Sequence, residues 1–236
     1  MRLPLLAGIA ASTLILATGY SAGRSALAQA RPDRLQTVLA QMDAGSRNFR
    51  SAEAAIQKQQ FEKIVNDTTT ESGTIYFVRS GATTQVGAKF DPPNAQTLEY
   101  KNGVARLYSA GTNHIDQYST SSANQTKFET FLTLGFGASG SDLAKQWMIA
   151  DQGTEQMSDG SRTVEVEKLD LVSKDPSVRN NFTHIAIWVD LARDLSLKQV
   201  FFTPAGDTQT AIYTNIRLNQ PIDLKAFAIK CKGKCS

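Results

Sequence analysis

The pattern of apolar and polar residues changes from helical to strand-like along the chain. Residues 33–45 carry apolar side chains at helical spacing, with Pro32 before them and Gly45 at their end, which predicts a short amphipathic helix. From residue 73 onwards, short alternating runs are separated by turn residues, which predicts strands. Residues 51–65 fit both states, because their propensities favour a helix while their alternation and the turn-rich stretch that follows would frame a strand.

The predicted strands form two groups with an aromatic segment between them. The first group is a meander of five strands without a helix between its members, and Asn102-Gly103 is a hairpin signal within it. Residues 124–136 are predicted to form an apolar helix, and a second short helix follows near residues 141–147. Counting residues 51–65 as a strand gives eleven strands, which indicates a sandwich or a barrel. The other ten are predicted over residues 73–80, 84–90, 95–100, 104–109, 114–119, 147–150, 162–169, 182–190, 195–202 and 208–218.

The first 28 residues have the parts of a cleaved export signal. Arg2 supplies a positive start, an apolar run follows, and the small-x-small site Ala26-Leu27-Ala28 predicts cleavage before Gln29. A membrane anchor is the alternative, since about 18 apolar residues can just span a bilayer. Because the run is followed by a cleavage site and by no basic stop-transfer cluster, we expect export and a soluble mature chain, a single domain over residues 29–236.

The predicted mature chain is close to neutral. The full sequence has 25 basic and 22 acidic residues, and removing residues 1–28 takes away Arg2 and Arg24 but no acid. The small remaining excess of positive charge implies neither nucleic acid nor an anionic membrane surface as a partner.

Both cysteines stand close to the C-terminus, as Cys231 and Cys235 with Gly233 between them. In an exported chain this spacing predicts a small disulfide loop, and the glycine eases its tight turn. Because neither a histidine nor a third cysteine lies nearby in the sequence, we expect no zinc or other metal site.

Residues able to catalyse a reaction are few and scattered. His114 and His184 are the only histidines, and each stands in a strand-like run. Glu165 and Glu167 alternate with valines, which is typical of a solvent-facing strand face. Because no nucleophile, phosphate-loop or Cys-x-x-Cys motif is present, we expect a protein that is not an enzyme and needs no cofactor. A scattered triad built on one of the two histidines is the alternative.

The aromatic segment fits either a ligand cavity or an ordinary core. A partly closed antiparallel sheet can enclose a cavity with helices across its open side. The glycines at the end of the segment suit a movable lid. In the alternative, the same side chains only fill a core. They are Phe128, Phe131, Leu132 and Phe136, with Trp147 behind them.

The order of these elements, together with two short motifs, resembles the LolA family of periplasmic lipoprotein carriers. The motifs are Gly73-Thr74-Ile75-Tyr76-Phe77-Val78-Arg79 and Lys101-Asn102-Gly103-Val104-Ala105-Arg106-Leu107-Tyr108. The resemblance in element order covers nearly the whole mature chain. It implies a mainly β fold with helices (α+β), an unclosed antiparallel half-barrel of about eleven strands with a helical lid.

The resemblance also implies a function. A monomeric periplasmic carrier would bind the acyl chains of lipoproteins, without a cofactor, receiving them from an inner-membrane transporter and delivering them to an outer-membrane receptor. Its cavity and lid would be formed by Ile75, Phe77, Phe90, Leu98, Tyr100, Phe128, Phe131, Leu132, Phe136 and Trp147.

Arg79 corresponds to the family arginine that holds the lid through backbone carbonyls. A guanidinium suits that role because it offers five donors in a fixed geometry. Taken alone, Arg79 would be read as a strand-end arginine that reaches water. The family proline after the arginine is replaced by Ser80, and Thr83 stands near the place of a hydrophobic residue that helps to hand over cargo. The half-barrel could therefore carry other lipids, or serve as an envelope module that binds a protein.

Overall fold

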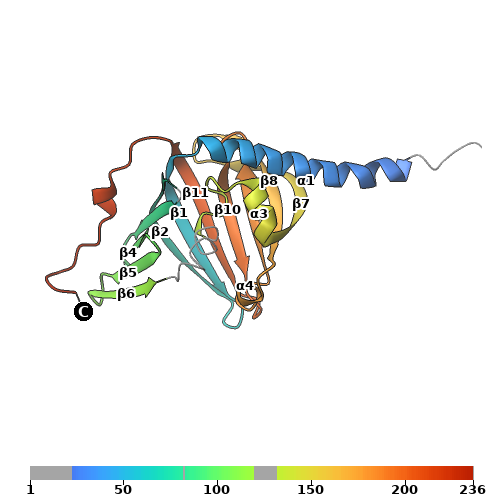
Figure 1. Ribbon diagram of the computed structural model, residues 1–236. Coiled ribbons are helices and arrows are strands. Elements are labelled where there is room, and N and C mark those ends of the chain that lie inside the picture. Colours follow the sequence, from blue (N-terminus) through green and yellow to red (C-terminus); the bar gives the residue numbers. More distant parts are fainter. Residues whose placement is uncertain (1–22, 82, 120–131, 236) are drawn as a thin grey trace, which may run out of the picture.

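The computed structural model describes residues 23–81, 83–119 and 132–235, which contain one antiparallel sheet of eleven strands. The strand order is β6-β5-β4-β3-β2-β1-β11-β10-β9-β8-β7, so β6 and β7 form the two ends and the sheet is unclosed. The strands are β1 Ser51–Glu62, β2 Asp67–Ser80, β3 Thr83–Phe90, β4 Gln96–Lys101, β5 Val104–Ser109, β6 His114–Ser119, β7 Trp147–Ser158, β8 Thr163–Ser173, β9 His184–Asp190, β10 Leu195–Phe202 and β11 Thr208–Leu218. The helices are α1 Gly23–Asn48, α3 Gly140–Gln146 and α4 Pro176–Arg179, with the 3-10 helix η1 Leu224–Phe227 (Figure 1).

The predicted fold class, a half-barrel of about eleven antiparallel strands with helices, is confirmed. The last two strands, β10 and β11, begin and end at the predicted residues. The helix predicted over residues 33–45 is part of α1, which extends beyond it at both ends.

Residues 51–62 form strand β1, which settles the ambiguity of this stretch. Ala52, Ala54 and Ile56 are buried on one face, and β1 pairs with β2 on one side and β11 on the other. These two ladders and the buried face outweigh the helical propensity of its glutamines and lysines. Residues 67–72, which the composition suggested as a turn, belong to β2 because they continue its ladder with β1.

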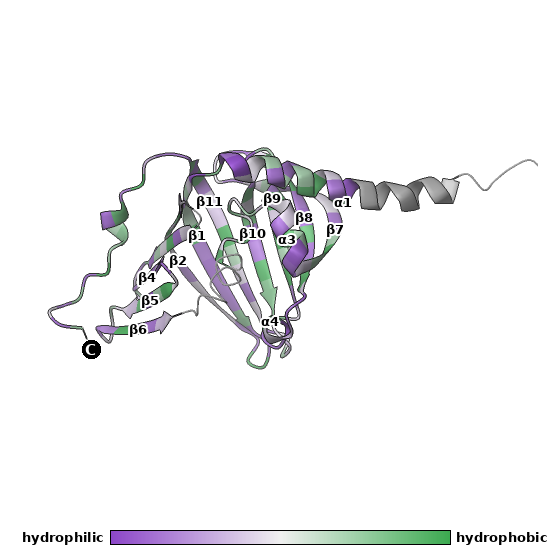
Figure 2. Cartoon of the chain, in the orientation of Figure 1, coloured by the Kyte–Doolittle hydropathy of each residue, from purple (hydrophilic) through white to green (hydrophobic). Residues whose placement is uncertain are grey.

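Helices α1 and α3 cover the part of the sheet formed by β8 and β9. Figure 2 shows the two helices lying over this part of the sheet. Val38 and Met42 of α1 and Leu143 of α3 are buried against it. Gly140 allows the two helices to approach closely, since a Cβ at this position would overlap the backbone of Leu39. The strand side of this cluster includes Trp147 of β7, together with Leu169, Leu171, Ile185, Ile187 and Val189 of β8 and β9.

Glu167 does not face solvent, so the prediction from its alternation with valines was wrong. Its side chain is 3% exposed, and Nη2 of Arg34 in α1 lies 2.9 Å from each carboxylate oxygen. Arg34 also pairs with Asp151 of β7, at 3.1 Å. The pattern misled because α1 lies over this face of β8, and a paired arginine allows a carboxylate to be buried there.

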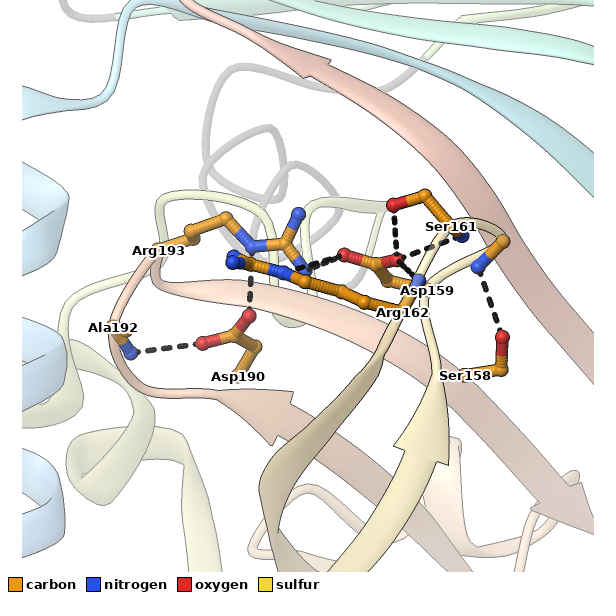
Figure 3. A network of polar contacts seen from close by, with 8 residues as sticks. Ser158, Asp159, Ser161, Arg162, Asp190, Ala192 and Arg193 are labelled. Atoms are coloured by element: carbon orange, nitrogen blue, oxygen red, sulfur yellow. Dashed lines mark hydrogen bonds and ion pairs between the residues drawn. The ribbon is translucent and has the colours of Figure 1, made fainter.

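A polar network joins the turn between β7 and β8 to the turn between β9 and β10 (Figure 3). The Asp159 carboxylate accepts hydrogen bonds from the backbone N–H groups of Ser161 and Arg162. These bonds hold the pKa of Asp159 well below its usual range. Arg193 lies 2.9 Å from the same carboxylate and 2.7 Å from that of Asp190. The network therefore fixes the position of the β9–β10 turn.

The chain after β11, residues 219–235, runs back along β3, β4 and β5 and is called the C-terminal strap (Figure 1). Phe227 packs edge-on against Tyr76 of β2, with ring centroids 4.6 Å apart. Further along, Ile229 donates its N–H to the Glu99 carboxylate at 2.9 Å. The strap thus covers a face of the sheet that a short meander would otherwise leave open.

The disulfide between Cys231 and Cys235 closes a loop at the end of the strap. The side chain of Asn113, in the β5–β6 turn, accepts a hydrogen bond from the Lys232 N–H and donates to the carbonyls of Lys232 and Lys234. One asparagine therefore binds the loop at three backbone groups.

Residues 1–22 and 120–131 lie outside the described part of the chain, so the export signal stays a prediction. Among the described residues, none of the helices combines the length and the apolar character needed to cross a membrane.

We predict that Asn113→Gly releases the C-terminal strap. Glycine tolerates the positive φ of 53° at this position, but removes the three hydrogen bonds to the disulfide loop. Trypsin should then cleave after Lys230 faster than in the wild type, which mass spectrometry of timed digests would measure. Asn102→Gly is the matched control, because Asn102 has φ 51° and, among the described residues, no bond to the strap. Equal cleavage rates in the two variants would contradict this role of Asn113.

Candidate functional site

Arg79, near the end of β2, binds three backbone carbonyls in two other parts of the chain. Its Nη1 donates to Ser46 O at 2.5 Å and to Phe49 O at 3.4 Å, and its Nη2 donates to Gly137 O at 2.6 Å. The guanidinium also lies over the Phe49 ring, 5.4 Å from its centroid. These three hydrogen bonds, called the Arg79 contact, join the end of α1 to the segment that precedes α3.

That segment, residues 132–139, is called the inner segment, and two other groups bind its backbone. Ser196 donates its N–H to Gly135 O at 2.6 Å, and the Gln199 side-chain amide donates to Leu134 O. With the Arg79 contact, three separate donors from β2 and β10 therefore hold the inner segment against the sheet.

The inner segment places the ring of Phe136 inside the half-barrel. Phe136 is 1% exposed and stacks on Phe77 of β2, with centroids 4.1 Å apart and planes 11° apart. Tyr213 of β11 meets the ring edge-on at 4.8 Å. Gly135 and Gly137 flank Phe136 with φ of 71° and 68°, a conformation that side-chain-bearing residues rarely adopt. The two glycines allow the chain to turn this one ring inward.

Most of the predicted cavity residues lie together. The cluster around Phe136 is lined by β1 to β4 and β11, and its apolar side chains contact one another. Those it includes from the prediction are Ile75, Phe77, Phe90, Leu98, Tyr100, Leu132 and Phe136. Phe128 and Phe131 lie outside the described residues.

Trp147 does not join this cluster. It packs with Leu143 and Leu171 beneath α3, because it begins β7, at the far end of the strand order from β2 to β4. Trp147 does share its cluster with Leu134, a residue of the aromatic segment, while Phe128 and Phe131 lie outside the described residues, so the prediction that it backs this segment stays a prediction. Of the helix predicted over residues 124–136, residues 124–131 lie outside the described residues, and its predicted end is wrong because a turn at Thr133 and the positive φ of Gly135 exclude a helix over residues 133–136.

Asp194, which sequence reasoning missed, lies buried beside the Arg79 contact. It occupies the β9–β10 turn with φ 53° and is 1% exposed. Neither carboxylate oxygen has a hydrogen-bond partner in the described part of the chain. Burial raises the pKa of Asp194 to about 7, while the charge of Arg79 opposes this shift and that of Asp43 adds to it. Its sequence context is an ordinary turn, which carries no signal of burial.

Tyr213 and Gln199 form a buried polar pair beneath the inner segment. The Tyr213 hydroxyl donates to Gln199 Oε1 at 3.2 Å, and the amide nitrogen of Gln199 donates to the backbone carbonyl of Leu134. Burial raises the pKa of Tyr213, so the hydroxyl stays neutral. A glutamine beside the apolar run Val200-Phe201-Phe202 of β10 is the signal that could have identified this pair.

The two histidines are placed on partly exposed parts of the sheet. His114 lies 3.5 Å from Asp116, and His184 lies 3.9 Å from Asp170. Among the described residues, no group of three or more histidine, cysteine, aspartate or glutamate side chains could hold a metal ion. The expectations that the protein is not an enzyme and needs no cofactor stay predictions.

No protein-family model and no curated protein sequence matches the chain. Solved structures do match it. MucB has a TM-score of 0.52 at 12% identity over 86% of this chain and 64% of MucB, and the Pseudomonas aeruginosa MucA/MucB complex gives 0.51 at 12% identity over 84% and 62%. An uncharacterised conserved protein from Thermus thermophilus gives 0.50 at 11% identity over 84% and 94%.

LolA-superfamily structures are also among the matches, for example a protein from Nitrosomonas europaea with a TM-score of 0.39 at 12% identity over 83% of this chain and 97% of that one. The half-barrel fold that the sequence resemblance implied is found in this chain. At such identities the likeness concerns the fold alone, and this chain spans less than two thirds of the length of MucB.

We predict that Gly137→Ala destabilises the protein more than Gly81→Ala does. Their φ values of 68° and 62° are similar, so both variants share a backbone cost of about 1–2 kcal/mol. Only at Gly137 would the new methyl group overlap the ring of Phe49, whereas nothing lies within 4 Å of it at Gly81. Urea unfolding should show Gly137→Ala to be less stable than Gly81→Ala by about 1–3 kcal/mol. Equal stabilities would mean that the inner segment is not tightly packed.

Proposed function

We propose that this protein carries acyl chains, as part of lipoproteins or of other lipids, and that the arrangement around Arg79 is its closed form. The observation that carries the proposal is the position of Phe136, which fills the interior and belongs to a segment that three donors hold by its backbone. A ring in this position can be exchanged for an acyl chain without leaving the interior empty.

The surface that Phe136 covers is suited to hydrocarbon. Its neighbours in the cluster are aromatic and aliphatic side chains of Phe77, Ile75, Val86 and Tyr100. Removing a phenylalanine ring from a core costs about 3–5 kcal/mol. Burying hydrocarbon contributes about 0.8 kcal/mol per methylene group, so an acyl chain with about ten buried methylenes would outweigh that loss.

The Arg79 contact is suited to opening and closing. A hydrogen bond from a charged donor contributes about 1.5–3 kcal/mol, and the bond from Arg79 to Gly137 O is the one that reaches the inner segment. It favours the closed form by an amount that a bound acyl chain can reverse. Its acceptor is a neutral carbonyl, so opening does not separate an ion pair. Loading and release would then depend on differences in affinity between the two forms and would need no cofactor.

The cellular setting in this proposal follows the sequence resemblance. The signal predicted over residues 1–28 would export the chain to the periplasm, where an inner-membrane transporter would load it and an outer-membrane receptor would unload it. Ser80 and Thr83 are polar and small, so hand-over would use contacts other than the hydrophobic one of the family pattern.

A second candidate is an envelope module that binds a protein. MucB, which shares this fold, was solved in complex with MucA. In this alternative the same half-barrel would bind a protein partner, and the Phe136 cluster would be a permanent core.

We predict that Arg79→Leu binds a fluorescent acyl probe about tenfold more tightly than the wild type, because the closed form loses the charged hydrogen bond that holds Gly137 of the inner segment. Fluorescence titration of the mature protein without detergent would measure both the affinity and the rate of release. Arg217→Leu is the matched control, since Arg217 pairs only with Glu53 at the surface in the described structure.

Each result bears on a separate part of the proposal. Equal affinity and equal release in Arg79→Leu and the wild type would remove Arg79 from the mechanism. Failure of every variant to bind the probe would contradict the acyl carrier and favour the protein-binding module.

A further inference from the structure

Asp194 is a buried carboxylate for which the closed arrangement has no partner. Both of its oxygens lack a hydrogen bond among the described residues, although the residue is 1% exposed. Unpaired buried carboxylates are costly when charged, so such a group is expected to serve another state of the protein. The next residue, Leu195, forms a β-bridge with Phe136, so Asp194 stands directly beside the element that has to move.

The groups that face Asp194 come from several elements. Gly45 of α1 lies against its Cβ, and any side chain at Gly45 would overlap it. The charged groups that act on it are Arg79 of β2 and Asp43 of α1. The inner segment contributes no charge, since residues 132–139 contain no ionisable side chain.

The neighbouring arginine of the β9–β10 turn already forms ion pairs with other carboxylates. Arg193 pairs with Asp190 at 2.7 Å and with Asp159 at 2.9 Å (Figure 3). This network leaves Arg79 as the cation available to Asp194, and it fixes the turn so that Asp194 cannot move away.

We propose that Asp194 is the second partner of Arg79: it takes the guanidinium when the inner segment leaves, so that opening releases a proton and acid holds the segment closed. This inference deepens the acyl-carrier function proposed above and rests on the inner segment being its movable part.

The exchange follows from the chemistry of the two states. When the segment is in place, the donors of Arg79 are directed to carbonyls. The Asp194 carboxyl is then shielded from water, which favours its protonated form. When the segment leaves, water enters, and Nη2 of Arg79, which had bound Gly137 O, becomes free to donate to a carboxylate. Both changes favour the ionised carboxylate, so its pKa falls on opening and a rise in pH favours the open form.

The same pKa shift predicts how stability changes with pH. The folded pKa of about 7 lies above the ordinary value of about 4, so the stabilising contribution of the neutral carboxyl is complete below that ordinary value and is lost progressively as pH rises from there to about 7. Asp194→Asn keeps the shape and tolerates φ 53°, and should therefore fold. Its melting temperature should exceed that of the wild type by the largest margin at pH 8, by less at pH 5, and should match it below about pH 4.

The decisive experiment follows two readouts between pH 5.5 and pH 8.5 in the wild type, Asp194→Asn and Asp91→Asn. Asp91 is exposed and serves as the matched control for loss of one carboxylate. The first readout is the affinity for a fluorescent acyl probe. The second is hydrogen–deuterium exchange of the amides of residues 133–137, corrected for intrinsic exchange.

We expect the wild type and Asp91→Asn to bind the probe more tightly as pH rises, by up to tenfold per pH unit, the limit for release of one proton. Exchange of the inner segment should increase in parallel. Asp194→Asn should be flat in both readouts and should stay at the weak affinity of the acidic wild type.

The outcomes separate this inference from the acyl-carrier function. A slope retained in Asp194→Asn, or a wild type whose corrected exchange does not change with pH, would overturn the role of Asp194. If no variant binds the probe, the carrier function fails, yet pH-dependent exchange in the wild type that is lost in Asp194→Asn would still support the partner exchange of Arg79.

Discussion

The bond between one guanidinium and three backbone carbonyls is the interaction on which the candidate site depends. It brings together β2, the end of α1 and the inner segment, which are distant in the sequence. Because Gly137 is held, Phe136 stays stacked on Phe77 in the interior. A charged donor on neutral acceptors is strong enough to keep this order and weak enough to be reversed by a ligand.

The half-barrel divides into a part that is permanently covered and a part that can be uncovered. Over β8 and β9, α1 and α3 bury an aliphatic cluster and the paired Glu167. Over β1 to β4 and β11, the cover is the inner segment, which is bound mainly through its backbone. Backbone bonds do not depend on side-chain packing, so this cover can leave as a unit while the sheet keeps its own ladders.

The sequence determines the sheet more clearly than the site, for physical reasons. Turn residues bound strands β10 and β11, which were predicted to the residue, whereas β1 needed its neighbours because its outer half is rich in glutamine. Arg79 could be singled out only through a family resemblance. Asp194 could not, because burial of a turn residue depends on what packs over it, in this case α1. The separation of Trp147 from Phe136 could not be predicted, because strand order cannot be read from a count of apolar residues.

The most direct test of this account is the contact between the rings of Phe77 and Phe136, followed by NMR in the mature protein with and without a bound fatty acid. The account predicts strong nuclear Overhauser effects between the two rings in the free protein, and their loss when the acyl chain is bound. A fatty acid that binds while these effects persist would show that the ligand does not replace Phe136, which would contradict the exchange on which the proposed function rests.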